Sequence, residues 1–248
     1  MNTQPSAAEI IKNCLEPDSG YNIFASTRTG PHHTANGEAN QDSYGYGIRS
    51  GGMVLVAVAD GAGSLSRSAE GSEYATASAV GDAMYHAPDE SCVEAVDGMI
   101  SRGVEAVTQY DDKSMGCTLA VAAIRHGEWA AATIGDSFVV VKEQSGEYHL
   151  ITSDAHEFGN VTELVTSTTP NVNRASGSGA VSFAVSSDGL EQTTLKDRAP
   201  FEPFWEDLFA RTTRGQLNLH ALFDYMDTKN MIVDDTSLVI GSQRQEGS

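Results

Sequence analysis

The segment Met53-Val-Leu-Val-Ala-Val-Ala-Asp-Gly-Ala-Gly63 contains the longest apolar run of the sequence. An uninterrupted apolar run rich in valine is typical of a strand that is covered on both faces. The run ends at Asp60, and the glycines that follow allow the backbone to turn sharply and to bring a carbonyl oxygen close to an ion. It is far shorter than the ~20 residues that span a bilayer, so it predicts a buried strand and not a transmembrane helix.

Other apolar runs divide the remaining chain into strands and helices. Strands are predicted at 117–124, 129–134, 138–141, 181–186 and 237–241. The short polar gaps between the first three favour an antiparallel meander. Apolar residues at helical spacing predict helices within 68–86, 93–107, 204–209 and 217–226. Residues 153–179 are rich in Ser, Thr, Asn and Gly without a clear period, and we expect a mobile excursion there, beside an active site.

Length and composition favour one soluble domain. The chain has 248 residues, close to the upper limit for a single core, and we expect one domain over 1–248. Its 34 acidic and 15 basic residues give a net charge of −19, which argues against nucleic acid and membrane partners. The N-terminus lacks the pattern of a secretory signal, and Cys14, Cys92 and Cys117 form no disulfide or zinc framework. These features predict a cytoplasmic protein.

Four aspartates lie at the ends of strand-like runs: Asp42, Asp60, Asp188 and Asp234. Aspartate is common in strand-end turns, so each one alone indicates little. If the strands are neighbours in a sheet, their carboxylates meet in one cleft, where protonation or a bound cation must relieve the repulsion. Ligands that are all oxygen favour Mg²⁺ or Mn²⁺ over zinc. No P-loop, GxSxG or HExxH motif is present, which leaves metal-dependent chemistry.

The order of six short motifs resembles the metal-dependent type-2C Ser/Thr protein phosphatases. The motifs are Asn40-Gln41-Asp42, Val58-Ala59-Asp60-Gly61-Ala62-Gly63, Gly116-Cys117-Thr118-Leu119, Gly135-Asp136-Ser137, Ser187-Asp188-Gly189-Leu190 and Asp234-Asp235-Thr236-Ser237. The opening Gly30-Pro31-His32-His33, followed by Gly37, and the stretch from Glu157 to Glu163 are similar to a compact bacterial subgroup.

The resemblance implies an α+β fold, a four-layer α-β-β-α sandwich with two central antiparallel sheets, in which 153–179 forms a flap. The implied enzyme is a metal-dependent protein-serine/threonine phosphatase, a phosphoric monoester hydrolase of signalling. Its reaction is direct attack by a water that bridges two metal ions. The implied cofactors are two Mn²⁺ or Mg²⁺ ions, with a position for a third. The expected partners are a phosphorylated protein substrate and a cognate Ser/Thr kinase, and the chain is expected to be a monomer.

The resemblance also assigns roles by motif position. Asp60 would bridge both ions, Gly61 would offer its carbonyl oxygen, Asp188 and Asp234 would hold the first ion, and Asp136 would share a third ion with Asp188. Gln41 and Asp42 would orient metal-bound waters.

Two positions depart from the family pattern. Gly37 stands where an arginine commonly grips the substrate phosphate, and Ala62 stands where many eukaryotic members have a histidine that protonates the leaving alkoxide. His33 is the candidate replacement and the second catalytic residue beside Asp60, although a lone histidine is more often a structural hydrogen-bonding group. Two other hypotheses stay open: a catalytically weak relative that binds phosphoproteins or regulates a partner, and an acidic decoy for a basic protein surface.

Overall fold

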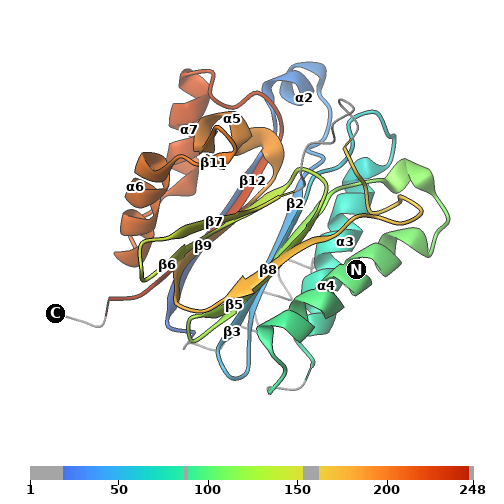
Figure 1. Ribbon diagram of the computed structural model, residues 1–248. Helices are drawn as coiled ribbons and strands as arrows, with labels where there is room; N and C mark the ends of the chain where they lie inside the picture. Colours follow the sequence, from blue (N-terminus) through green and yellow to red (C-terminus); the bar gives the residue numbers. More distant parts are fainter. Residues whose placement is uncertain (1–18, 87–88, 153–161, 246–248) are drawn as a thin grey trace, which may run out of the picture.

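The computed structural model describes residues 19–86, 89–152 and 162–245. Two antiparallel sheets of five strands stack face to face between two layers of helices (Figure 1). The arrangement confirms the predicted α-β-β-α sandwich. Residues 1–18, which include Cys14, and residues 153–161 of the expected excursion lie outside the described residues. Within the described ranges, no helix is both long enough and apolar enough to cross a membrane.

The strands of each sheet pair only in antiparallel fashion. One sheet has the order β1-β12-β9-β6-β7, formed by Tyr21–Arg28, Thr236–Gln243, Ala180–Ser186, Phe138–Glu143 and Tyr148–Ile151. The other has the order β2-β3-β4-β5-β8, formed by Ser43–Arg49, Met53–Ala59, Leu119–Arg125, Glu128–Ile134 and Asn173–Gly177. The register of the first sheet aligns Val239, Val185 and Val139 in one row, which faces the second sheet.

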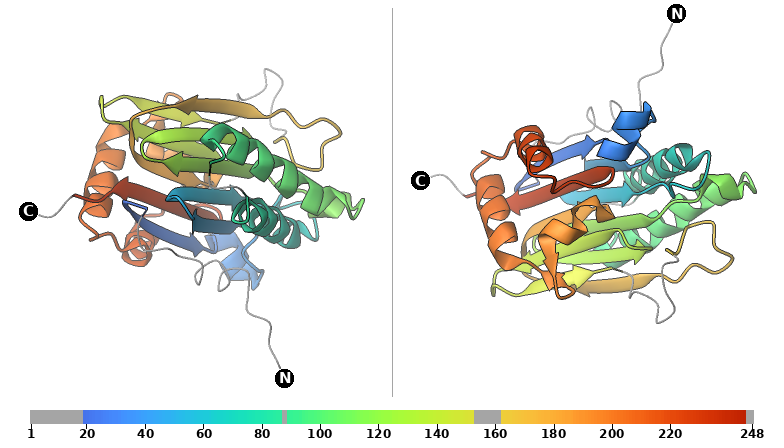
Figure 2. Two further views of the ribbon diagram at one scale, coloured as in Figure 1. Left: turned by 90° about the horizontal axis from the view of Figure 1, so that it is seen from below. Right: turned by 90° about the horizontal axis from the view of Figure 1, so that it is seen from above.

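Helices cover the outer face of each sheet (Figure 2). Helices α3 (Ser68–Ala83) and α4 (Cys92–Thr108) lie on the sheet that contains β3, and α6 (Glu202–Thr213) and α7 (Leu219–Thr228) lie on the other. The shorter elements are α2 (Pro31–Asn36), α5 (Glu191–Thr194), the 3₁₀ turns η1 (Lys113–Met115) and η2 (Asp188–Leu190), and the hairpin of β10 (Leu195–Lys196) and β11 (Ala199–Pro200).

Strand β3 is apolar throughout because both of its faces are buried. Leu55 and Ala57 pack toward α3 and α4, whereas Val54, Val56 and Val58 pack between the two sheets. Every residue of the strand is fully buried. Burial of one such valine side chain contributes about 1.5 kcal/mol. The continuous apolar run therefore places β3 at the centre of the fold and delivers Asp60 to its end.

The structure differs from the sequence predictions in one connection and in polar segments. The predicted meander holds for β4 and β5, but β6 lies in the other sheet, because the chain crosses the sandwich at the turn that contains Asp136. The excursion expected at 153–179 contains strand β8, which pairs with the edge of β5. Its side chains are mostly exposed or half-buried, so no apolar alternation marks it in the sequence. Helix α2 was not predicted because none of its residues is buried. The role of 153–179 as a flap stays a prediction.

Candidate metal centre

Three of the predicted carboxylates meet where the two sheets end together. Asp60 follows β3, Asp136 lies in the turn from β5 to β6, and Asp188 follows β9. One carboxylate oxygen from each of the three lies within 4.8 Å of the other two. The strands come from both sheets, so the cluster sits across the end of the sandwich. Of the four strand-end aspartates expected to converge, Asp60 and Asp188 do so, and Asp136 of the Gly-Asp-Ser motif joins them.

Hydrogen bonds among three motifs fix the backbone at Asp60. Its N–H donates to Thr118 Oγ1 at 3.0 Å, and its carbonyl accepts the N–H of Thr118 at 2.8 Å. The Thr118 hydroxyl also shares a hydrogen bond of 2.7 Å with Ser137 Oγ, beside Asp136. Threonine and serine at these positions therefore join the end of β3 to the β5–β6 turn.

Gly61 is required by close packing. A Cβ atom there would lie 2.8 Å from the carbonyl oxygen of Gln41 and 2.8 Å from the carbonyl carbon of Ser68. The Gly61 N–H donates to that same Gln41 carbonyl at 3.1 Å. The Gln41 side-chain oxygen accepts the hydroxyl of Ser68 at 3.1 Å. Gln41 thus holds the loop after β3 against the start of α3, and its predicted role in orienting waters stays a prediction.

Asp42 is buried beside the cluster and is anchored to the other sheet. Its Oδ2 accepts the hydroxyl hydrogen of Ser187 at 2.6 Å, and Ser187 Oγ accepts the N–H of Ser237 at 2.9 Å. Ser187 was not singled out as a functional residue in the sequence. It ties Asp42 to the ends of β9 and β12, next to Asp188.

The carboxylates repel one another in a largely dry environment. Burial, with the charges of Asp42, Asp188 and Asp136, raises the pKa of Asp60 well above its ordinary value. The buried oxygens Asp42 Oδ1, Asp136 Oδ1 and Asp188 Oδ1 have no hydrogen-bond partner among the described residues. Buried carboxylate oxygens without a donor are costly unless a cation binds them. Oxygen ligands of this kind fit Mg²⁺ or Mn²⁺.

These shifts predict how the metal-free protein responds to pH. Burial and nearby carboxylates raise the pKa of Asp42 to about 8 and that of Asp188 to about 6. The pKa of each carboxyl is near 4 in the unfolded chain. Between pH 4 and the raised pKa the folded state therefore binds more protons than the unfolded chain, and it loses stability as pH rises through that range. In EDTA we expect the free energy of unfolding, from urea titrations, to fall between pH 6 and 8 by up to about 1.4 kcal/mol per unit for each proton.

Two comparisons test this pH prediction. Asp42→Asn removes one of the titrating groups and should flatten the slope in EDTA. Saturating Mn²⁺ should flatten it as well, because a bound cation stabilises the ionised carboxylates. A metal-free protein whose stability rises between pH 6 and 8 contradicts the prediction.

Asp234 lies next to the cluster and not within it. Its carboxylate groups with His33 and Asp235, and its Oδ1 accepts the N–H of Asp235 at 2.8 Å. Its charge nevertheless contributes to the raised pKa of Asp188, so the two side chains are electrostatic neighbours. The assignment of Asp234 as a metal ligand stays a prediction.

Asp235 is the residue that the sequence interpretation missed. It is only 3% exposed and accepts three hydrogen bonds, from Gly30 N–H at 2.6 Å, Gln41 N–H at 2.6 Å and His33 Nδ1 at 2.9 Å. The only signal for it is its place in the Asp-Asp-Thr-Ser motif, where the first aspartate draws attention. Asp235 joins the opening motif to the C-terminal strand and orients His33.

His33 stands on α2 with both ring nitrogens near carboxylates. Its side chain is 12% exposed, and its Nε2 lies 3.6 Å from Glu38 Oε2. Burial lowers the pKa of His33, but the hydrogen bond to Asp235 and the nearby acidic charges outweigh it, so the net pKa is raised. The imidazole is thus held by one buried acid, Asp235, and its other nitrogen lies beside Glu38.

Two threonines, Thr152 and Thr162, donate hydrogen bonds to Asp136. Thr162 Oγ1 donates to Asp136 Oδ2 at 2.7 Å, and Thr152 Oγ1 donates to its backbone carbonyl at 3.4 Å. One carboxylate oxygen is thereby satisfied, and the other stays directed at the cluster. Residues on both sides of 153–161 therefore contact the metal centre.

Comparison with known proteins gives a family and a fold. The family model for protein phosphatase 2C matches residues 29–224. No curated protein matches the sequence. A bacterial serine phosphatase has a similar structure, with a TM-score of 0.66 and 16% identity over 91% of this chain and 99% of the other.

Two further solved structures are similar. Serine/threonine phosphatase Stp1 from Staphylococcus aureus has a TM-score of 0.64 and 17% identity over 91% of this chain and 95% of the other. The catalytic domain of serine threonine protein phosphatase PstP, in complex with two manganese ions, has a TM-score of 0.66 and 18% identity over 91% and 99%. At these identities the likeness establishes the fold alone.

Proposed function

The chain belongs to the protein phosphatase 2C family and is a protein Ser/Thr phosphatase, and we propose that its reaction requires Mn²⁺ or Mg²⁺ bound at the carboxylate cluster. The observation that carries the proposal is the convergence of Asp60, Asp136 and Asp188 with buried, unpartnered oxygens. The PstP structure, which contains two manganese ions, supports the choice of metal.

Five groups of the chain would hold the ions. They are the carboxylates of Asp60, Asp188, Asp234 and Asp136 and the carbonyl of Gly61. When bound, two divalent cations supply an activated water for direct attack on phosphorus and neutralise the phosphoryl oxygens. Asp136 would serve a third ion with Asp188. No nucleophilic side chain is needed, and Cys117 is fully buried in the core.

The residues around the cluster keep its carboxylates in place. Asp42, held by Ser187, and Gln41, held at the start of α3, orient water at the edge of the centre. His33 is oriented by Asp235, and its Nε2, which lies 3.6 Å from Glu38 Oε2, would contact the phosphoryl group or protonate the leaving oxygen. Its raised pKa favours the protonated form that both roles need.

The biological setting is part of the proposal. The substrate is a phosphorylated protein, a Ser/Thr kinase supplies it, and the enzyme acts as a cytoplasmic monomer. Cys92 and Cys117 are buried free thiols, which agrees with a reducing compartment.

Metal removal tests the proposal directly. We expect hydrolysis of p-nitrophenyl phosphate with Mn²⁺ or Mg²⁺, loss of activity in excess EDTA, and recovery when Mn²⁺ is restored. The same series on a phosphoserine peptide checks that the activity extends to a phosphoprotein-like substrate. Equal rates with and without EDTA would overturn metal dependence. Phosphopeptide binding without hydrolysis under any metal condition would instead identify the catalytically weak relative, against which the intact carboxylate cluster counts.

Asp42→Asn is expected to lower activity less than loss of a metal ligand. The lost charge would act on the ions through water and not by direct coordination, and such supporting residues typically contribute about 10- to 100-fold. The asparagine keeps an oxygen that can accept the Ser187 hydroxyl, so the fold should be preserved. Mn²⁺ titrations of activity measure the change. A defect as severe as that of Asp60→Asn would place Asp42 in direct contact with a metal.

A further inference from the structure

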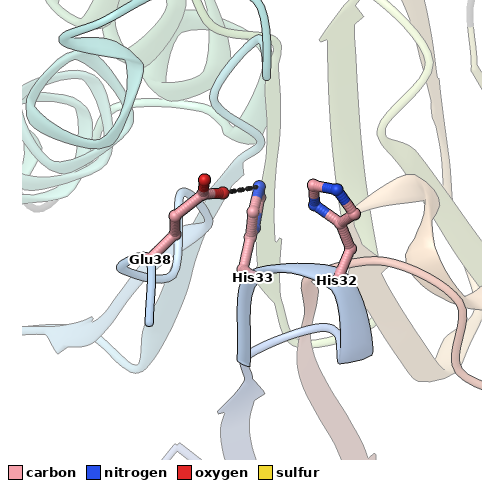
Figure 3. A group of neighbouring side chains, drawn as sticks. All are labelled: His32, His33 and Glu38. Carbon is pink, nitrogen blue, oxygen red and sulfur yellow. Dashed lines mark ion pairs between the residues drawn. The ribbon is translucent and has the colours of Figure 1, made fainter. Parts of the chain in front are cut away.

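Two histidines and a glutamate gather at helix α2 (Figure 3). His32 and His33 rise side by side from the helix, and Glu38 faces His33 from the chain that follows it. One ligand atom from each of the three lies within 4.8 Å of the other two. From this group we propose a second metal site, for a transition-metal cation of the zinc class, distinct from the oxygen-ligand centre.

The backbone at the end of α2 brings Glu38 to the histidines. Gly37 has a φ of 68°, a left-handed conformation that glycine adopts without strain. The turn returns the chain toward the helix, and the N–H of Glu38 donates to the carbonyl of His33 at 2.9 Å. Residues adjacent to each other across this turn thus supply a compact set of ligands.

His33 is prepared to bind a cation through Nε2. Its Nδ1–H donates to the buried carboxylate of Asp235 at 2.9 Å, so a cation that displaces the proton from Nε2 would bind the lone pair there. Metal-binding histidines in proteins are commonly oriented by a carboxylate in this way. The Nε2 atom lies 3.6 Å from Glu38 Oε2, close to the roughly 3.3 Å that separates two ligands of a tetrahedral zinc ion.

His32 completes the set from an exposed position. Its ring centre lies 5.7 Å from that of His33, and Asn36 Nδ2 lies 3.3 Å from its Nε2. Because the side chains of His32 and Glu38 are exposed, small rotations can close the site around an ion, with water as a fourth ligand. Two imidazoles and one carboxylate favour Zn²⁺, Co²⁺ or Ni²⁺, whereas Mg²⁺ prefers oxygen ligands.

The His33 ring contacts residues next to both proposed metal sites. Nδ1 faces Asp235, whose neighbour Asp234 belongs to the proposed phosphatase centre, and Nε2 faces Glu38. A zinc ion would occupy the nitrogen assigned to the phosphoryl group, so bound zinc would slow the phosphatase. That consequence rests on the proposed function, but zinc binding itself does not.

The test measures binding, independently of turnover. The full chain without an affinity tag is first saturated with Mg²⁺ to fill the carboxylate centre. Co²⁺ is then titrated, and its binding is followed by visible absorption, which becomes stronger when nitrogen ligands coordinate the ion. In a separate experiment, Zn²⁺ binding is measured by calorimetry. We expect about one Zn²⁺ per chain and displacement of Co²⁺. His32→Ala and Glu38→Gln should each weaken binding by at least about tenfold.

Two variants serve as controls. His86→Ala removes another histidine that lies 3.1 Å from a carboxylate, that of Glu90, and it should leave zinc binding unchanged. Asp60→Asn should also leave it unchanged, because the carboxylate centre is a different site. Zinc binding that is insensitive to His32→Ala and Glu38→Gln, or that disappears in Asp60→Asn, overturns the proposal. These titrations measure metal binding and not turnover. If the wild-type chain proved to have no phosphatase activity, the result of the zinc test would be unchanged, so the two proposals fail independently.

Discussion

Asp60→Asn is expected to abolish Mn²⁺-dependent phosphatase activity while the chain stays folded. Asp60 lies at the end of the fully buried strand β3, and its carboxylate is the one assigned to both ions. Loss of one charge that two cations share removes several kcal/mol of transition-state stabilisation, and about 4 kcal/mol corresponds to about 10³-fold in rate. Rates with p-nitrophenyl phosphate at saturating Mn²⁺ measure the effect.

The fold of this variant can be checked without metal. The Asp60 carboxyl is nearly isosteric with the asparagine amide, and the backbone hydrogen bonds to Thr118 do not involve the side chain. Because burial and the charges of other carboxylates raise the pKa of Asp60, its neutral replacement should preserve or raise the unfolding temperature in EDTA. Asp207→Asn, at an exposed position of helix α6, is a matched control that should keep full activity. More than a few per cent of wild-type activity in Asp60→Asn contradicts the bridging role.

Much of the sandwich is predictable because its strands are apolar for simple reasons. Strands β3, β4 and β5 are buried on both faces, so their runs of valine and alanine stand out in the sequence. Asp60 and Asp136 follow β3 and β5, and they meet Asp188, which follows β9 of the other sheet. Strand β8 escapes prediction because it is a polar strand at a sheet edge, where pairing with β5 and not burial defines it.

The supporting residues of the site are harder to predict because their contacts cross the chain. Asp235 reaches Gly30, His33 and Gln41, which are about 200 positions away in the sequence. No local pattern distinguishes an aspartate that accepts three buried hydrogen bonds from one that caps a turn. The same is true of Ser187, whose hydroxyl links Asp42 to β12.

The structure shows the backbone at the position where the family commonly has its phosphate-gripping arginine. Gly37, at the corresponding position, ends helix α2 in a left-handed conformation with a φ of 68°. An arginine there would cost about 1–2 kcal/mol in backbone strain, which disfavours it at this position. Helix α2 brings His33 to Asp235 instead, which makes His33 the candidate for the missing function.

His33→Ala is therefore expected to reduce turnover by about 10²-fold, a typical contribution from one general acid. The two possible roles give different kinetics. Loss of a proton donor should slow a phosphoserine peptide, whose alkoxide is a poor leaving group, much more than p-nitrophenyl phosphate. Loss of a phosphate contact should raise KM for both substrates instead. Steady-state kinetics of both substrates, at saturating Mn²⁺, distinguish these outcomes.

His33→Asn distinguishes a catalytic role of His33 from a structural role as the hydrogen-bond partner of Asp235. The asparagine amide can donate to Asp235 from the position of Nδ1, but it offers no titratable group at the position of Nε2. If His33 acts only by satisfying the buried carboxylate, His33→Asn should recover most of the activity that His33→Ala loses. If His33 acts on the phosphoryl group or on the leaving oxygen, both variants should be equally impaired. Wild-type kinetics in both variants, for both substrates, contradict any catalytic role for His33 and leave it as a structural partner of Asp235.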